Sequence, residues 1–133
     1  MIWIMEEKQI ILSLFSNYDI AQKKTREYLG RNTQLFISPR KDKKYRVYDP
    51  INRKWVDFGQ MYFYDHTKHG NDKKRELYLK RATKIKGNWK SNLYSPNNLS
   101  INILWWWLGL QYDTKLSSNV QFLFLLSYWS PIW

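Results

Sequence analysis

Residues 44–58, which read KYRVYDPINRKWVDF, decide the fold that we expect for the middle of the chain. Residues 44–49 and 53–58 are rich in β-branched and aromatic side chains and follow the period of two that is typical of strands. Between them, Asp49 and Pro50 fit the first two positions of a type I turn, where the φ angle fixed by proline is already correct. The stretch therefore predicts an antiparallel β-hairpin.

The hairpin mixes aromatic and basic side chains. In a strand, Tyr45 and Val47 share one face and Arg46 and Tyr48 share the other, so one face carries a cation beside a ring. Exposed rings, including that of Trp55, can stack on nucleic-acid bases at about 1–3 kcal/mol each while cations contact phosphates. The same rings also fit the core of the hairpin, and no complete nucleic-acid-binding motif accompanies them.

Further helices and strands are expected around the hairpin. Apolar residues at helical spacing predict a short helix over residues 6–16, and Asp19 can cap a second helix that ends at Gly30. Residues 34–38 are typical of a strand, and residues 61–64 can add another after the hairpin. N-terminal helices combined with a small antiparallel sheet indicate a small single α+β domain.

The clearest helix is expected over residues 73–86, with Asn71 or Asp72 as its cap and Gly87 at its end. One side of this helix gathers Tyr78, Leu79, Ala82 and Ile85. The opposite side gathers Lys73, Lys74, Lys80, Arg81 and Lys84. The sequence thus predicts a basic amphipathic helix, whose row of cations is either a solvated surface or part of a binding face.

Composition narrows the function classes. The 133 residues are enough for one domain and include no cysteine, which excludes a disulfide framework, a thiolate zinc site and a thiol nucleophile. The net charge of +11 excludes an acidic binder and predicts attraction to polyanions or acidic protein surfaces. The charge is concentrated in the centre. We therefore divide the chain into an N-terminal helical segment (1–35), a basic α+β domain (36–106) and an apolar aromatic C-terminal arm (107–133).

Twelve basic side chains of the hairpin and the basic helix are the candidates for polyanion binding. They are Arg40, Lys41, Lys43, Lys44, Arg46, Arg53, Lys54, Lys73, Lys74, Lys80, Arg81 and Lys84. About six contacts between these cations and the phosphates of a duplex would give log affinity a slope of about −5 against log salt.

The end of the chain is apolar and nearly uncharged. Its apolar stretches, residues 101–110 and 120–133, are each shorter than the ~20 residues that cross a bilayer as a helix. Their aromatic side chains fit a lipid interface, a buried cluster or a contact with another protein, and we favour the last two environments. The candidates for a protein interface are Trp105, Trp106, Trp107, Phe122, Phe124, Trp129 and Trp133.

No motif indicates catalysis. His66 and His69 are three residues apart and, with Asp65 and Asp72, offer possible metal ligands, but the chain has no other histidine and neighbouring lysines would repel a cation. We favour a loop in which these side chains hydrogen-bond locally. The glycines are too widely spaced to cradle a phosphate. We therefore expect no catalytic residue, no metal, no cofactor and no small-molecule substrate.

Six short motifs follow one another along the chain. They are ISPRKDKKY (37–45), VDFG (56–59), YDHTxHxxD (64–72), RxxYxxR (75–81), SPNNLS (95–100) and LW (104–105). In this order they resemble a family of uncharacterised small basic proteins encoded by large eukaryotic (nucleocytoplasmic) DNA viruses, over about residues 36–106. The resemblance implies a viral product packaged in the virion and carries no catalytic residues. After Trp105 the chain departs from the family pattern, in which a glycine often follows.

Two functions compete at this stage. The first is a non-enzymatic viral structural protein, such as a minor capsid or cement-type component of the virion. It would contact capsid subunits through its aromatic arm and acidic surfaces through its basic centre, and would also occur in the host cytoplasm or viral factory during assembly. The second is a nucleic-acid-binding or genome-condensing protein that contacts DNA through residues 40–54 and 73–86, with an anionic membrane surface as a further partner for the cations. We expect the first function, and burial of the C-terminal aromatic residues would favour the second.

Overall fold

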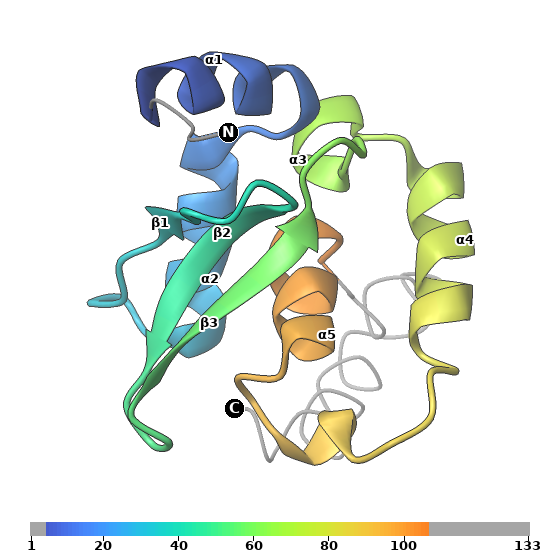
Figure 1. Ribbon diagram of the computed structural model, residues 1–133. Coiled ribbons are helices and arrows are strands. Elements are labelled where there is room, and N and C mark those ends of the chain that lie inside the picture. Colours follow the sequence, from blue (N-terminus) through green and yellow to red (C-terminus); the bar gives the residue numbers. More distant parts are fainter. Residues whose placement is uncertain (1–4, 107–133) are drawn as a thin grey trace.

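The computed structural model describes residues 5–106 of the chain (Figure 1). Its elements are α1 (Met5–Phe15), α2 (Tyr18–Leu29), β1 (Phe36–Ile37), β2 (Lys43–Asp49), β3 (Lys54–Gln60), α3 (His66–His69), α4 (Asp72–Ala82), the 3₁₀ turn η1 (Trp89–Ser91), α5 (Pro96–Leu99) and the π-helical turn η2 (Ser100–Leu104). The predicted α+β fold is confirmed. Within the described residues, no helix has both the length and the apolar character needed to cross a bilayer.

The three strands form an antiparallel sheet in the order β1-β2-β3. The predicted hairpin is confirmed, with Val47 opposite Val56. Asp49 closes its turn, because the carboxylate accepts hydrogen bonds from the backbone amides of Ile51 and Asn52 at 2.9 and 3.1 Å. The expected strand over residues 61–64 is wrong, because the chain leaves the sheet after Gln60 and forms a turn.

Two helix boundaries differ from those expected. Asn17, not Asp19, caps α2, and its side chain accepts a hydrogen bond from the amide of Ile20. The basic helix α4 ends at Ala82, four residues before the predicted end, so Ile85 is 54% exposed instead of packed. The α4 cap is Asn71, one of the two residues proposed from the sequence.

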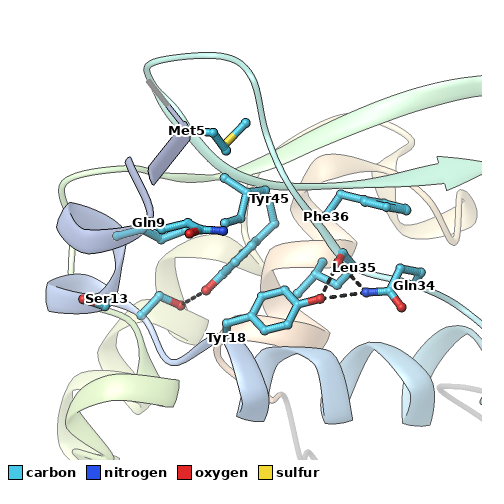
Figure 2. A pocket seen from close by; sticks show the side chains of 11 residues that line it. Met5, Gln9, Ser13, Tyr18, Gln34, Leu35, Phe36 and Tyr45 are labelled. Carbon is cyan, nitrogen blue, oxygen red and sulfur yellow. Dashed lines mark hydrogen bonds between the residues drawn. The ribbon is translucent and has the colours of Figure 1, made fainter. Parts of the chain in front are cut away.

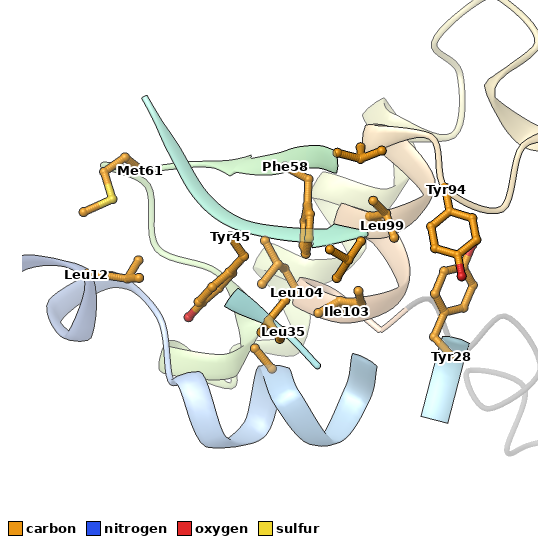
Figure 3. Packing of buried hydrophobic residues seen from close by; sticks show 13 residues of the cluster. Leu12, Tyr28, Leu35, Tyr45, Phe58, Met61, Tyr94, Leu99, Ile103 and Leu104 are labelled. Carbon is orange, nitrogen blue, oxygen red and sulfur yellow. The ribbon is translucent and has the colours of Figure 1, made fainter. Parts of the chain in front are cut away.

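The main core lies between the inner face of the sheet and the helices α2 and α5–η2. Phe58 of the hairpin lies beside Leu99 and Leu104 of the α5–η2 helix, whereas the Tyr45 ring points toward the N-terminal helices (Figure 3). The N-terminal helices contribute Leu12, Ala21 and Tyr28 to the same cluster. The described part of the N-terminal segment and residues 36–106 therefore share one core.

The helix α4 packs on the other side of α5–η2 through a smaller cluster. Leu79 and Ala82 of α4 meet Ile101 of η2 there, and Tyr78 and Trp105 pack against them. Figure 1 shows α4 standing beside α5 and apart from α2. The apolar side of α4 is thus held against η2, and Lys73, Lys74, Lys80 and Arg81 stay exposed.

A cavity of about 590 Å³ separates α1 from α2 and β1 (Figure 2). At its edge, the hydroxyl of Tyr18 donates a hydrogen bond to the carbonyl of Leu35 at 2.6 Å, and the Gln34 amide donates to the Tyr18 hydroxyl at 2.7 Å. The hydroxyl of Tyr45 donates to that of Ser16. The first two bonds attach the residues just before β1 to α2, and the third joins β2 to the turn between α1 and α2.

Lys8 on α1 is fully buried although it is charged. Its ammonium group donates hydrogen bonds to the carbonyls of Ser38, Arg40 and Lys43, the last two at 2.6 and 2.7 Å. Burial lowers its pKa. The side chain therefore acts as a cap for the loop between β1 and β2, which carries two of the predicted cations, Arg40 and Lys41.

Candidate nucleic-acid interface

Three exposed rings lie together on the outer face of the sheet. Phe36, Tyr48 and Trp55 are 45%, 43% and 45% exposed. The ring of Trp55 lies between the other two, with centroid distances of 5.5 Å to Phe36 and 5.3 Å to Tyr48 and near-perpendicular planes. We call Phe36, Arg46, Tyr48 and Trp55 the aromatic face. Side chains alternate between the two faces of a strand, which explains why these four share the outer face. Their neighbours in β2 and β3 turn inward to the core: Tyr45, Val47, Val56 and Phe58.

Arg46 is held in place within the aromatic face. Its guanidinium carbon lies 5.0 Å from the ring centroid of Trp55. Its Nε donates to the carboxylate of Asp57 at 3.1 Å, and Asp57 also accepts a hydrogen bond from the hydroxyl of Ser38 at 2.6 Å. Arg46 and Asp57 lie directly opposite each other on β2 and β3. The cation is thus oriented by a carboxylate and a ring.

Nine of the twelve predicted cations are exposed. They are Arg40, Lys41, Arg53, Lys54, Lys73, Lys74, Lys80, Arg81 and Lys84. Within this group, only Arg40 forms an ion pair with another described residue, to Asp42 at 3.0 Å. Lys43 and Arg46 are half-buried. Most of the positive charge expected from the sequence is therefore accessible to an anionic partner.

Lys44 is a correction to the predicted set. Its side chain is only 2% exposed, and its ammonium group donates to the carboxylate of Asp65 at 2.8 Å and to the carbonyl of Phe63. Burial lowers the pKa of Lys44, which the Asp65 carboxylate partly offsets. A cation enclosed in this way cannot reach a polyanion, so its assignment to the binding surface is wrong.

His66, His69 and the neighbouring aspartates contact residues of α3 and α4. His66 Nε2 lies 3.2 Å from a carboxylate oxygen of Asp72, and Asp65 caps α3 through the amide of Thr67. His66 Nδ1 and His69 Nε2 are buried without a hydrogen-bond partner. Within residues 5–106, no three side chains of His, Cys, Asp or Glu are placed to hold a metal ion.

Trp105 and Trp106 contact residues of the domain itself. Trp105 stacks on Tyr78 with a centroid distance of 4.2 Å, and Trp106 meets His66 edge-on at 4.3 Å. The ammonium of Lys24 lies 4.6 Å from the Trp106 ring. Both indoles are half-buried. The other predicted interface residues, Trp107, Phe122, Phe124, Trp129 and Trp133, lie outside the described residues, as does the whole predicted arm.

Sequence reasoning missed the part that Phe36 plays. Tyr48 and Trp55 stand out because they alternate with basic residues in the hairpin. Phe36 joins them because it pairs with Arg46 across β1 and β2. That register depends on a five-residue connection between the two strands, and the sequence pattern does not specify it.

The comparison with protein families gives one match, to a family described as a "Family of unknown function (DUF5754)", over residues 33–82. The matched segment extends from just before β1 to the last residue of α4. It therefore contains the aromatic face and the basic helix. No curated protein and no solved structure matches the chain. The family description states neither a source nor an activity, so the resemblance to virus-encoded proteins stays a prediction.

Proposed function

We propose that this chain is a non-enzymatic protein that binds single-stranded nucleic acid on its aromatic face. In this proposal, bases stack on Phe36, Tyr48 and Trp55, and phosphates contact the cations beside them. Arg46 lies within this face, and Arg53, which is exposed in the turn two residues before Trp55, is the nearest further candidate. Lys54 pairs with Asp49 and therefore lies on the other face of the sheet. The observation that carries the proposal is the exposure of Phe36, Tyr48 and Trp55 in contact on one sheet face, with the guanidinium group of Arg46 beside Trp55.

The chemistry of the aromatic face favours a strand with unpaired bases over a duplex. A base stacked on an aromatic ring contributes about 1–3 kcal/mol, and this contribution needs an unpaired base with an open face. Rings on the outside of an antiparallel sheet offer such platforms to successive bases. Arg46 adds a guanidinium plane beside Trp55 that is already oriented by Asp57. A strand of stacked bases is the partner whose charge and rings complement this surface.

The competing explanation is that the rings only complete the fold. Rings that serve packing alone are usually enclosed by their neighbours, whereas Tyr48 and Trp55 keep 43% and 45% of their surface exposed. Exposed apolar side chains that touch one another form a patch, and such patches commonly mark interaction sites. The patch, together with its cations, therefore supports a binding surface.

Fluorescence anisotropy with an oligothymidine of about 15 nucleotides tests the proposal, since site sizes on such platforms are about 4–16 nucleotides. We expect Trp55→Ala to weaken binding by about 1–3 kcal/mol. Tyr62→Ala is the matched control, because Tyr62 is 53% exposed and lies outside the aromatic face. Trp55→Leu, which keeps an apolar side chain over Phe36 and Tyr48, separates lost stacking from lost folding. Wild-type affinity in both Trp55 variants would contradict the proposal.

A role in a viral assembly, as a minor capsid or cement-type component, stays a second proposal. Ile10 and Leu14 support it, because they lie one helical turn apart on α1 and are 68% and 56% exposed. In an assembly, this pair would contact a neighbouring capsid subunit. Ile10→Ser/Leu14→Ser is then expected to reduce incorporation of the chain into particles without changing its melting temperature. Full incorporation of the double variant would contradict this role for α1.

A further inference from the structure

A cleft of about 610 Å³ lies where the open end of the hairpin meets α4 and the α5–η2 helix. Three segments that are distant in sequence form its walls. Lys43 and Gln60 line it from the sheet, Tyr78 and Arg81 from α4, and Asn97 and Trp105 from the last helix. Its volume falls within the range of about 300–1,000 Å³ that is common for small-ligand sites.

The cleft is lined by cations from both predicted basic groups, and one of them, Lys44, is already paired with Asp65. Lys43 belongs to β2 and Arg81 to α4, and both line the cleft. Neither forms an ion pair with a described residue, and no acidic side chain is among the described residues that line the cleft. Two cations that converge on a concave site without a counter-charge favour an anionic ligand.

Aromatic side chains form much of the remaining wall. Tyr78 and Trp105 stack on each other at 4.2 Å with an angle of 11° between their planes. Phe63 and Tyr64, from the turn after β3, also line the cleft and are 63% and 54% exposed. Burial raises the pKa of Tyr78 to about 12, so its hydroxyl stays protonated at neutral pH. The site therefore combines ring surfaces with hydroxyl and amide groups able to hydrogen-bond.

We propose that this cleft binds a nucleoside phosphate, with its phosphate held between Lys43 and Arg81 and its base against the aromatic wall. The side-chain amides of Gln60 and Asn97 supply donors and acceptors for the edge of the base or the sugar hydroxyls. A planar aromatic ring attached to an anion is the ligand class that matches both halves of the site. The inference is separate from the proposed function, because no residue of the aromatic face lines the cleft.

Calorimetric titration of the full chain with each of the four ribonucleoside monophosphates tests this inference. We expect at least one of them to bind, and we expect the matching nucleoside and ribose 5-phosphate to bind at least about tenfold more weakly, since each lacks one half of the interaction. Arg81→Gln should weaken the binding of the monophosphate by about tenfold or more. The matched control is Lys84→Gln, because Lys84 is exposed beyond the end of α4 and does not line the cleft.

Two results would overturn the inference. One is that none of the four monophosphates binds, and the other is that Arg81→Gln and Lys43→Gln both keep wild-type affinity for the monophosphate. The ligand of the cleft is either a free nucleotide or the 5′-phosphorylated end of a strand. Oligothymidine with and without a 5′-phosphate distinguishes the two, because only a site for strand ends should bind the phosphorylated oligonucleotide more tightly. Trp55→Ala separates this site from the aromatic face, since it should leave the affinity for the monophosphate unchanged.

Discussion

The ammonium group of Lys44 lies 2.8 Å from the carboxylate of Asp65, and the two side chains are only 2% and 1% exposed. The same carboxylate accepts hydrogen bonds from the amide and the hydroxyl of Thr67, and Asp65 thereby caps α3. Lys44 also donates to the carbonyl of Phe63. The ion pair thus fixes the turn between β3 and α3 onto β2, and this turn forms one wall of the cleft.

We expect Lys44→Met to lower the free energy of unfolding by about 3–5 kcal/mol, because it leaves the Asp65 carboxylate buried without its counter-charge. Urea denaturation measures the change. Lys41→Met is the matched control and should change stability by less than about 0.5 kcal/mol, since Lys41 is exposed. Lys44→Met/Asp65→Asn should be more stable than Lys44→Met alone. A double variant whose loss equals the sum of the two single losses would contradict a direct interaction.

Gly59 allows β3 to approach η2 closely. Its φ angle is +82°, and a Cβ atom at this position would lie 2.8 Å from the Leu104 Cδ1 atom. We expect Gly59→Ala to destabilise the domain by about 1–3 kcal/mol through this overlap, in addition to the strain of a positive φ angle. Gly87→Ala provides the control, because Gly87 also has a positive φ angle but no atom lies within 4 Å of its Cβ position. Equal losses in thermal unfolding would show that the contact with Leu104 has no effect.

The parts of the fold that were predictable from the sequence are those encoded by neighbouring residues. The hairpin follows from two alternating runs around Asp49 and Pro50, and the start of α4 follows from the capping side chain of Asn71. The sequence pattern places the end of α4 too late, because Gly87 is the residue there that is typical of a helix end. The helix ends at Ala82 instead, where its last buried residue meets the α5–η2 helix.

The parts that were missed depend on contacts between distant residues. In the sequence, Lys44 does not differ from its neighbour Lys43, and only the fold brings it into contact with Asp65, twenty-one positions later. Phe36 belongs to the aromatic face only through its pairing with Arg46. The cleft likewise requires Lys43 and Arg81 to be brought together by the packing of α4 on η2. Composition predicted the positive charge of this region correctly but could not show which cations are buried.

The buried histidines predict a loss of stability in mild acid. Burial lowers the pKa of His66 below its usual value of 6.5, and the positive charge of Arg75 lowers it as well. The carboxylates of Asp72 and Asp65 raise this pKa, but their effect is smaller. Burial also lowers the pKa of His69, and His66, Lys74 and Lys44 act in the same direction, with Asp65 opposing them. The unfolded chain therefore binds protons more readily than the folded chain below pH 6.5, so stability falls as pH decreases from there toward the folded-state pKa values.

Urea midpoints measured between about pH 7 and pH 5 test this dependence. We expect a decrease over this range in the wild type and a flatter profile in His66→Gln/His69→Gln. The comparison uses the slope of the midpoint against pH, because replacing the buried His66 and the half-buried His69 shifts the absolute stability as well. A profile of the double variant that is parallel to that of the wild type would mean that other groups cause the decrease.

The salt dependence of binding shows whether α4 contributes to the nucleic-acid interface. About six phosphate contacts on a single strand give a slope of about −4 for log affinity against log salt. Lys73→Gln/Lys80→Gln/Lys84→Gln removes three exposed cations from α4 and the residues just beyond it. The slope should stay close to that of the wild type, because α4 packs on η2, beyond the inner face of the sheet, whereas the aromatic face is on the outer side. The matched control is Lys23→Gln/Arg26→Gln/Arg31→Gln, because these exposed cations of α2 and the turn after it lie outside the proposed surface. Equal slopes for the wild type and the α4 variant would restrict the phosphate contacts to the hairpin. A reduced slope in the α4 variant alone would contradict this expectation, whereas a reduced slope in the control as well would indicate binding by net charge alone.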